Sequence, residues 1–241
     1  MFPIRVQGTT RSNSPSRNLI GLAKNQTRSR TKNHVISAFL DVEKAYDKIW
    51  RKGLIHKIRT LPIPIYLAKI VQEWIEDRRF RVKVNQAVST ERTAMEGLLQ
   101  GSSLSPILFN LFVRELPDTI TDKDTKLFQF ADDTALVTNG KNAASCCKKM
   151  EKNFREIDEY TKRWKIKINQ DKTEVVGFGK KIPNANSITW NGKTIKIKKS
   201  GTYLGITIDN QLKMQQHTTR RGTLAKRKIR NLYPLLENLY S

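Results

Sequence analysis

The sequence predicts an α+β fold in which an antiparallel sheet is backed by helices. Apolar, β-branched runs such as 35–41 and 173–179 have the length and composition of buried strands. Residues 142–165 instead place their apolar side chains at alternating steps of three and four, which is typical of a long amphipathic helix. Asn191–Gly192 lies between two alternating runs and indicates a tight hairpin, whose strands are necessarily antiparallel.

The remaining elements follow from the same signals along the chain. The other predicted strands are 79–85, 127–137 with its central turn, 165–169, 188–198 with its hairpin turn, and 203–208. The other predicted helices are 42–61, 65–77, 105–116 and the basic tail from 211 onward. Pro64 is expected to start one of these helices, and Ser105 to cap another with Pro106 at its first helical position.

Composition indicates a polyanionic partner. The 241 residues carry 45 Lys or Arg against 22 Asp or Glu, a formal net charge of +23. A nucleic acid is therefore the leading partner and an anionic membrane surface the second. No apolar run approaches the roughly 18 residues of a membrane span, and the start of the sequence lacks the apolar core of a secretory signal. These patterns predict an intracellular protein that does not insert into a membrane.

The two cysteines are expected to be reduced. Cys146 and Cys147 are sequence neighbours, which is poor geometry for a disulfide and supplies at most half of a zinc site. The three histidines fall in no metal-ligand spacing. We therefore expect reducing surroundings and neither a disulfide nor a zinc site to stabilise the fold.

Three features that could form a catalytic or binding site follow one another along the chain. A strand ends in Asp41, a Gln-Gly-Ser loop over 100–106 opens a helix, and a hairpin holds Asp132 and Asp133 in the stretch QFADDTALV. An Asp pair between two strands has an ordinary interpretation as a solvated turn. It is also a candidate metal site, because hard divalent cations bind carboxylate oxygens. If the strands that carry Asp41 and Asp132 pair side by side, their carboxylates converge into a cradle for two cations.

Five motifs, taken together and in this order, resemble a known family: the reverse transcriptases of non-LTR (LINE-type) retrotransposons, and among them the jockey-like elements. The motifs are FLDVEKAYDKIW (39–50), LQGSSLSPILFNLF (99–112), FADDTALV (130–137), WKIKINQDKTEVVGF (164–178) and YLGITID (203–209). The likeness runs from about residue 19 to about residue 236. It implies a polymerase palm, with an antiparallel sheet backed by helices, and RNA-directed DNA polymerase activity.

The resemblance assigns a catalytic set by position. It implies that Asp41 and Asp132 hold two Mg²⁺ ions, with Mn²⁺ as an alternative, and that Asp133 completes the palm carboxylates in a supporting role. The backbone carbonyl of Val42 is implied as a further ligand. Two cations clamp the entering and leaving oxygens of nucleotidyl transfer, which is the chemistry that these ligands suit. Lys172 matches a lysine that donates a proton to the leaving pyrophosphate.

Other motif positions are implied to bind the nucleotide. Tyr46 matches an aromatic beneath the nucleotide sugar, where a flat ring would exclude a 2′-hydroxyl; its ordinary alternative is a core aromatic. Gln100 and Gly101 match the loop that meets the incoming nucleotide and the template, where glycine allows close backbone approach. We interpret Glu43 and Asp47 as structural or solvated helix residues outside the site.

The resemblance also divides the chain. The expected parts are a disordered basic arm (1–18), a remnant of the fingers (19–34), the palm (35–209) and the start of a basic helical thumb (210–241). The hairpin that grips the primer end is expected at Tyr203, Leu204 and Gly205. Because only 40 residues precede Asp41, the upstream fingers motifs are expected to be absent and the chain to be N-terminally truncated.

The predicted function is RNA-directed DNA synthesis with an RNA template, a DNA primer and deoxynucleotide triphosphates as partners. The family suggests a nucleus or a cytoplasmic ribonucleoprotein as its location. Two alternatives stay open at this point. A truncated chain without fingers contacts would bind nucleic acid without catalysis, for which the charge of +23 is sufficient. A two-metal nuclease would share the carboxylates but leave the Gln-Gly loop and the Tyr-Leu-Gly hairpin unexplained.

Overall fold

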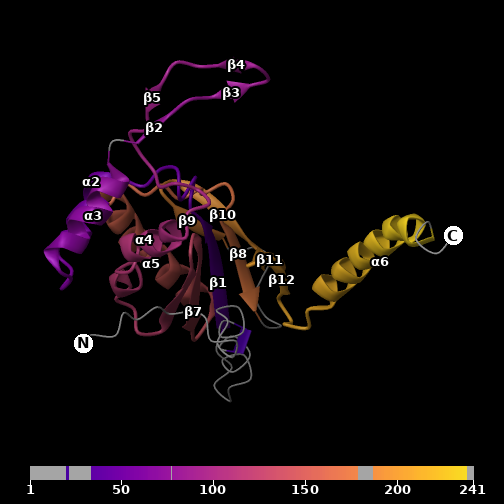
Figure 1. Cartoon of the computed structure of the whole chain (residues 1–241). Coiled ribbons are helices and arrows are strands. Elements are labelled where there is room, and N and C mark those ends of the chain that lie inside the picture. The colour runs from indigo at the N-terminus through magenta and orange to yellow at the C-terminus, as the bar shows by residue number, and fades with distance from the viewer. Residues whose placement is uncertain (1–19, 22–33, 77, 179–186, 238–241) are drawn as a thin grey trace.

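The computed structural model describes residues 20–21, 34–76, 78–178 and 187–237, and it has the predicted α+β architecture (Figure 1). A six-stranded sheet forms its centre, with the strand order β6-β7-β1-β8-β10-β9. These strands are β6 Thr125–Phe130, β7 Asp133–Gly140, β1 His34–Asp41, β8 Glu174–Phe178, β10 Lys193–Lys198 and β9 Ser187–Trp190. Neighbouring strands are antiparallel except β10 and β8, which pair in parallel, so the sheet is mixed.

Strand β1 lies in the middle of the sheet and contributes to the core on both faces. Ile36, Ala38 and Leu40 belong to the core on one face. Val35 and Phe39 belong to the core on the other face. Because successive side chains of a strand point to opposite faces, a strand covered on both sides must be apolar at almost every position. This explains the continuous apolar run that predicted the strand.

Helix α5, Ala143–Arg163, covers the first of these faces. Asn142 caps it, because the side-chain oxygen of Asn142 accepts a hydrogen bond from the Ser145 backbone N–H. The predicted apolar stripe packs against the sheet, and the Phe154 ring stacks on Trp190 of β9 with 4.3 Å between the ring centroids. The long amphipathic helix is therefore confirmed to within two residues at each end.

Helices α2 (Arg51–Arg59), α3 (Ile65–Ile75) and α4 (Leu104–Phe112) form a second layer with an apolar core of its own. α2 packs against both α3 and α4, so α3 joins this layer through α2. Lys57 of α2 is 3% exposed, and its ammonium lies 3.8 Å from the centre of the Trp164 ring. This cation–π contact joins α2 to the residue that follows α5.

The prediction of a helix over 42–61 is correct only from Arg51 onward. Residues 43–48 form successive turns, and Lys44 adopts a left-handed conformation with a φ of 48°, which a helix cannot contain. Periodicity alone does not show this break. Its consequence is that Tyr46 lies on an irregular segment directly after β1.

The predicted start of α4 is also wrong. The helix begins at Leu104, with Ser103 at the N-cap position. Ser105 lies inside the first turn and is buried, and its hydroxyl donates a hydrogen bond to the Leu99 carbonyl instead of capping the helix. The serine therefore fastens the preceding loop to the helix.

Between α3 and α4 the chain forms a two-stranded arm, which projects from the body of the molecule in Figure 1. β2 (Arg79–Phe80) pairs with β5 (Arg92–Thr93) at the base of the arm, and β3 (Lys83–Val84) pairs with β4 (Ala87–Val88) near its tip. The segment 79–85, predicted as a strand, contains β2 and β3 and forms one side of this narrow hairpin.

The second face of the sheet is covered in part by the hairpin of β11 (Ser200–Tyr203) and β12 (Ile206–Asp209). Its turn at Leu204–Gly205, where φ is 51° and 70°, interrupts the single strand that was predicted here. Gly201 allows the hairpin to approach the sheet closely, because an added Cβ would lie 2.7 Å from Cγ2 of Val176.

Helix α6, Gln215–Glu237, follows this hairpin and extends away from the sheet (Figure 1). Leu224, Ile229 and Leu232 are between 43% and 63% exposed, so much of its apolar surface contacts solvent. The predicted helical tail is confirmed over this range. No helix within the described ranges is long and apolar enough to cross a membrane.

Two expected segments lie outside the described residues. These are the basic arm over 1–18 and, apart from Ile20, Gly21 and His34, the fingers remnant over 19–34.

Candidate active site

The end of β1 meets the start of β7, and two of the predicted carboxylates lie there side by side. Asp41 and Asp133 are direct partners in the antiparallel register. Two residues away on the same strands, Phe39 and Ala135 belong to the core under the β11–β12 hairpin. Since residues two apart share a face, both carboxylates lie on the face opposite α5. The side chain of Asp41 is 42% exposed there.

The backbone hydrogen bonds beyond β1 show which way each group points. The Asp41 carbonyl accepts a hydrogen bond from the Asn169 N–H (2.8 Å), and the Glu43 N–H donates to the Lys167 carbonyl (2.7 Å). Both bonds lie on the edge of β1 that faces β8, and consecutive residues of a strand direct their backbone groups to opposite edges. The carbonyl of Val42 therefore points to the other edge, toward β7 and its turn.

The same alternation makes Asp41 and Asp133 a non-hydrogen-bonded pair, the class in which opposed side chains approach most closely. Asp132 precedes Asp133 in the turn, after Ala131 in a left-handed conformation with a φ of 52°. Burial, and then the charges of Asp132 and Asp41, raise the pKa of Asp133. Three like charges thus share one end of the sheet, an arrangement that favours a bound cation.

Lys172 supplies a positive charge to this end of the sheet. Its ammonium lies 3.5 Å from the Asp41 carboxylate. The preceding turn is fixed by Asn169, whose side-chain oxygen accepts hydrogen bonds from the backbone N–H groups of Asp171 (3.0 Å) and Lys172 (3.3 Å). The side chain of Lys172 is 68% exposed, and exposed ion pairs are weak. Lys172 is therefore able to exchange Asp41 for another anion.

Tyr46 lies in the turns after β1 and packs against α4. Its ring centroid is 5.1 Å from that of Phe109, and its carbonyl accepts a hydrogen bond from the Leu98 N–H at 2.7 Å. Burial, and then the negative charge of Asp132, raise the pKa of its hydroxyl. Tyr46 is thus a packed aromatic, as its ordinary interpretation holds, and also a neighbour of a predicted metal ligand.

The loop before α4 is joined to the same turns by an unexpected side-chain contact. Nε2 of Gln100 donates a hydrogen bond to Oδ1 of Asp47 at 2.7 Å. Of the two roles considered for Asp47, structural or solvated, this contact favours the structural one. Gly101 has a φ of 87°, which favours glycine over any other residue. The structure therefore connects the two motifs that the resemblance assigns to nucleotide binding.

A buried arginine holds the segment that leads into this loop. The guanidinium of Arg51 donates hydrogen bonds to three backbone carbonyls, those of Ala94, Glu96 and Gly97. Gly97 has no room for a side chain, because an added Cβ would lie 2.5 Å from the Asp47 carbonyl oxygen. The return strand of the arm is consequently clamped onto the turns after β1.

The β11–β12 hairpin brings Tyr203 close to the carboxylates. Tyr203 is 2% exposed, and its ring stacks on Phe39 with 5.5 Å between the centroids. Its hydroxyl donates a long hydrogen bond (3.5 Å) to the Phe128 carbonyl. Burial, and then the charge of Asp133, raise the pKa of Tyr203 far above its ordinary value. Leu204 and Gly205 form the turn beyond it, with Leu204 partly buried against the core and Gly205 exposed.

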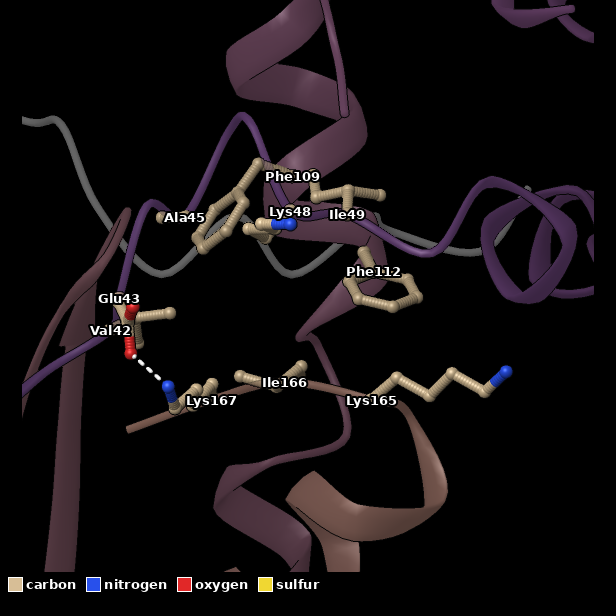
Figure 2. A pocket seen from close by; sticks show the side chains of 10 residues that line it. All are labelled: Val42, Glu43, Ala45, Lys48, Ile49, Phe109, Phe112, Lys165, Ile166 and Lys167. Carbon is tan, nitrogen blue, oxygen red and sulfur yellow. Dashed lines mark ion pairs between the residues drawn. The ribbon is translucent and has the colours of Figure 1, made fainter. Parts of the chain in front are cut away.

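A small hollow lies behind the end of β1, and Figure 2 shows the side chains that line it. Glu43 and Lys167 flank it and form an ion pair of 2.9 Å. Phe109 and Phe112 of α4 supply part of its apolar lining. The predicted carboxylates are not among its lining residues, so the hollow belongs to the packing that supports the strand end.

Comparison with known proteins agrees with this geometry. A family model described as reverse transcriptase (RNA-dependent DNA polymerase) matches residues 6–208. The chain belongs to the reverse transcriptase family. The RNA-directed DNA polymerase from mobile element jockey of Drosophila melanogaster is 28% identical over 204 residues, and the probable RNA-directed DNA polymerase from transposon BS of the same organism is 32% identical over 205 residues.

These two alignments cover 82% and 79% of this reverse transcriptase chain and 22% of each relative. The chain therefore spans about a fifth of the length of the curated relatives it matches. The resemblance to jockey-like elements that the five motifs indicated is confirmed.

Solved structures share the fold of this chain. The structure of apo telomerase from Candida tropicalis, truncated from the C-terminal domain, has a TM-score of 0.59 at 19% identity over 86% of this chain and 40% of that one. Telomerase from the same organism, in complex with a TWJ fragment of telomeric RNA, has a TM-score of 0.58 at 15% identity over 87% and 34%. At such identities the likeness concerns the fold, and it confirms the predicted fold class.

The contacts of two residues around the site were not predicted from the sequence. Asp47 lies six residues after Asp41 in the same motif, and that position was the available signal. Arg51 had no signal, because it is one of 45 basic residues and only the structure shows it buried among carbonyls.

Proposed function

We propose that this chain is the palm of an RNA-directed DNA polymerase, with residues 35–209 as the palm and 210–241 as the start of the thumb. The observation that carries the proposal is the convergence of Asp41 and Asp133 at the ends of paired strands, with Asp132 in the adjoining turn. Membership of the reverse transcriptase family supports the activity. The substrates would be an RNA template, a DNA primer and deoxynucleotide triphosphates, all polyanions suited to a chain of charge +23.

Carboxylate and carbonyl oxygens are the type of ligand that Mg²⁺ and Mn²⁺ prefer, which supports a site for two such ions. In this proposal Asp41 and Asp132 provide the carboxylate ligands, and the Val42 carbonyl adds a neutral oxygen. The direction of that carbonyl, toward the turn of β7, supports its inclusion. Asp133 supports the site through its charge. Bound there, the ions would activate the primer 3′-hydroxyl and neutralise charge on the leaving pyrophosphate.

The surrounding side chains would hold the nucleotide. Lys172, once released from Asp41, would donate a proton to the leaving pyrophosphate. The ring of Tyr46 would lie beneath the sugar and exclude a 2′-hydroxyl, which its place beside Asp132 supports. Gln100 and Gly101 would meet the incoming nucleotide and the template.

The β11–β12 hairpin would hold the primer end. Gly205 of its tight turn is exposed, while Tyr203 fixes the hairpin to the sheet near Asp133. Primer phosphates would then be positioned by backbone groups, without regard to sequence.

The experiment that tests the proposal is extension of an oligo(dT) primer on a poly(rA) template by the purified chain with Mg²⁺. Asp132→Ala should lower the rate by roughly 100-fold or more, because cation-based charge stabilisation contributes several kcal/mol. Glu159→Ala on the exposed side of α5 is the matched control and should extend normally. Full activity of Asp132→Ala would contradict the assignment.

A second candidate function is nucleic-acid binding without catalysis. The net charge of +23 favours it, because phosphate neutralisation by Lys and Arg alone gives salt-sensitive binding. A folded chain that binds the template and primer in a salt-dependent manner, but extends nothing, would establish this function. Binding unaffected by Asp41→Ala would agree with it.

A further inference from the structure

The arm over residues 78–94 has the form of a binding element. It projects from the body near α2 and α3 (Figure 1). None of its residues belongs to the three buried clusters of the described chain. It carries five Arg or Lys and one Glu, which gives a formal charge of +4. A charged ribbon that adds nothing to the core is a candidate for contact with a partner.

One face of the arm is basic. Arg79 in β2, Arg81 between the two strands and Lys83 in β3 occupy alternate positions along one side of the arm. In an extended segment, side chains at such positions leave the same face. The ion pairs of Glu91 support this geometry. From the other side of the arm, its carboxylate lies 3.2 Å from the Arg79 guanidinium and 3.4 Å from the Arg81 guanidinium. The two arginine side chains are 58% and 62% exposed, so these ion pairs are weak and a phosphate can replace the carboxylate.

The spacing of this face suits a phosphate backbone. Alternate residues of a strand are about 6.6 Å apart, which is comparable to the separation of neighbouring phosphates along a nucleic-acid strand. Three positive charges in a row therefore match three successive phosphates. A compact anion would use only one of them.

The opposite face is mainly apolar, although it includes one arginine. Phe80, Val82 and Val84 alternate with the basic residues and are 46%, 50% and 64% exposed. Arg92 lies directly across from Phe80 in the register. Two-stranded ribbons of this kind enter nucleic-acid grooves, where basic side chains meet phosphates and apolar ones meet sugars and bases.

The base of the arm adjoins the candidate active site. The Ala94 N–H donates to the Arg78 carbonyl at 2.7 Å and closes the hairpin. The Ala94 and Gly97 carbonyls then bind Arg51, and three residues later the chain reaches Gln100. A nucleic acid that occupies the candidate site would therefore leave it near the arm.

We propose that the arm binds the phosphate backbone of the nucleic-acid substrate outside the active site, through Arg79, Arg81 and Lys83. The inference rests on the proposed function in one respect, namely that the substrate is a nucleic acid. The contact is independent of base sequence and of the metal ligands. It holds the template and primer while their ends lie at Asp41.

The test is binding of a fluorescein-labelled poly(rA)–oligo(dT) duplex by the full chain, followed by anisotropy over a series of salt concentrations. Arg81→Gln/Lys83→Gln should weaken binding and reduce the slope of log K against log[salt] by about 1 to 2 units, because each phosphate contact contributes about 0.7 to 0.9. Glu91→Gln removes the competing carboxylate and should strengthen binding several-fold. Circular dichroism checks that each variant is folded.

The matched control is Arg155→Gln/Lys162→Gln, which makes the same change in net charge on the exposed side of α5. Its slope should stay close to that of the wild type. If the arm variant binds with the wild-type slope, the arm proposal is overturned, whereas extension lost in Asp132→Ala would still support the polymerase. A wild-type chain that does not bind the duplex would overturn both. Arm substitutions that change only self-association would assign the arm to protein contacts and overturn the proposal.

Discussion

The two faces of the central sheet are built from the same strands and have opposite properties. On the face toward α5, apolar residues of every strand continue to the edges. The buried Asn153 side chain donates hydrogen bonds there to the hydroxyls of Thr125 and Thr138. On the other face the apolar core ends at Phe39, and Asp41 follows two residues later with a half-exposed carboxylate.

This difference shows how a single strand serves stability and chemistry together. Alternate residues of β1 point to opposite faces, so burial on the α5 side does not restrict what stands on the open side. At the open end, burial and then the gathered like charges raise the pKa of Asp133. Such an arrangement costs stability, and the well-packed face offsets it.

The largest effect is expected from a substitution on the α5 face. Phe154→Ala should lower the free energy of unfolding by about 3 to 5 kcal/mol, because it leaves a cavity beside Trp190 in a fully buried core. Denaturant unfolding followed by far-ultraviolet circular dichroism measures this loss. Phe130→Ala is the matched control at a ring that is 43% exposed, and should cost less than about 1 kcal/mol. Equal losses of unfolding free energy in the two variants would mean that the two faces contribute alike to stability.

A smaller effect is expected where the hairpin meets the open face. Gly201→Ala should cost about 1 to 3 kcal/mol, because the new Cβ would meet Val176 at 2.7 Å and Phe39 at 2.9 Å, both buried. The displaced hairpin would also shift Tyr203, so primer extension should fall. Gly222→Ala on α6, where nothing lies within 4 Å, is the control and should be neutral or slightly stabilising. Unchanged stability of Gly201→Ala would show that the hairpin is loosely attached.

Local periodicity was enough to predict most of the sheet and the long helix. β1, β8 and α5 follow directly from their apolar patterns, and the turn of β9 and β10 from Asn191–Gly192, where both φ values are positive. The motif order predicted that Asp41 and the Asp132–Asp133 pair converge. The register adds that Asp133 is the direct partner of Asp41.

Features that depend on distant contacts were not predictable. The parallel pairing of β10 with β8 and the position of α3 on α2 depend on how complete elements pack. The bond between Gln100 and Asp47 joins residues 53 apart, and no local pattern marks it. The alternation over 79–85 predicted a strand, and β2 and β3 lie there, but alternation does not show whether such a segment is an exposed ribbon or a half-buried strand.

The smallest effect is expected from removing one charge on the open face. The pKa of Asp133 is raised above 3.8 in the folded chain, so the folded state binds a proton more readily than the unfolded state, and stability falls as pH rises through this window. Asp133→Asn removes this penalty. It should raise the free energy of unfolding at pH 7 by less than about 1 kcal/mol after solvent screening, which appears as a higher urea midpoint. This gain should vanish below pH 3.8.

Urea titrations at pH 7 and at pH 3.5 measure this change, with Glu159→Gln on the exposed side of α5 as the control for a lost carboxylate. Primer extension by Asp133→Asn should fall while its stability at pH 7 rises, because the same charge that repels Asp41 also supports the proposed cation site. A variant that is less stable than the wild type at pH 7 would mean that Asp133 is held by favourable contacts. The open face would then be stabilised as it stands, and the cost assigned to its gathered charges would be wrong.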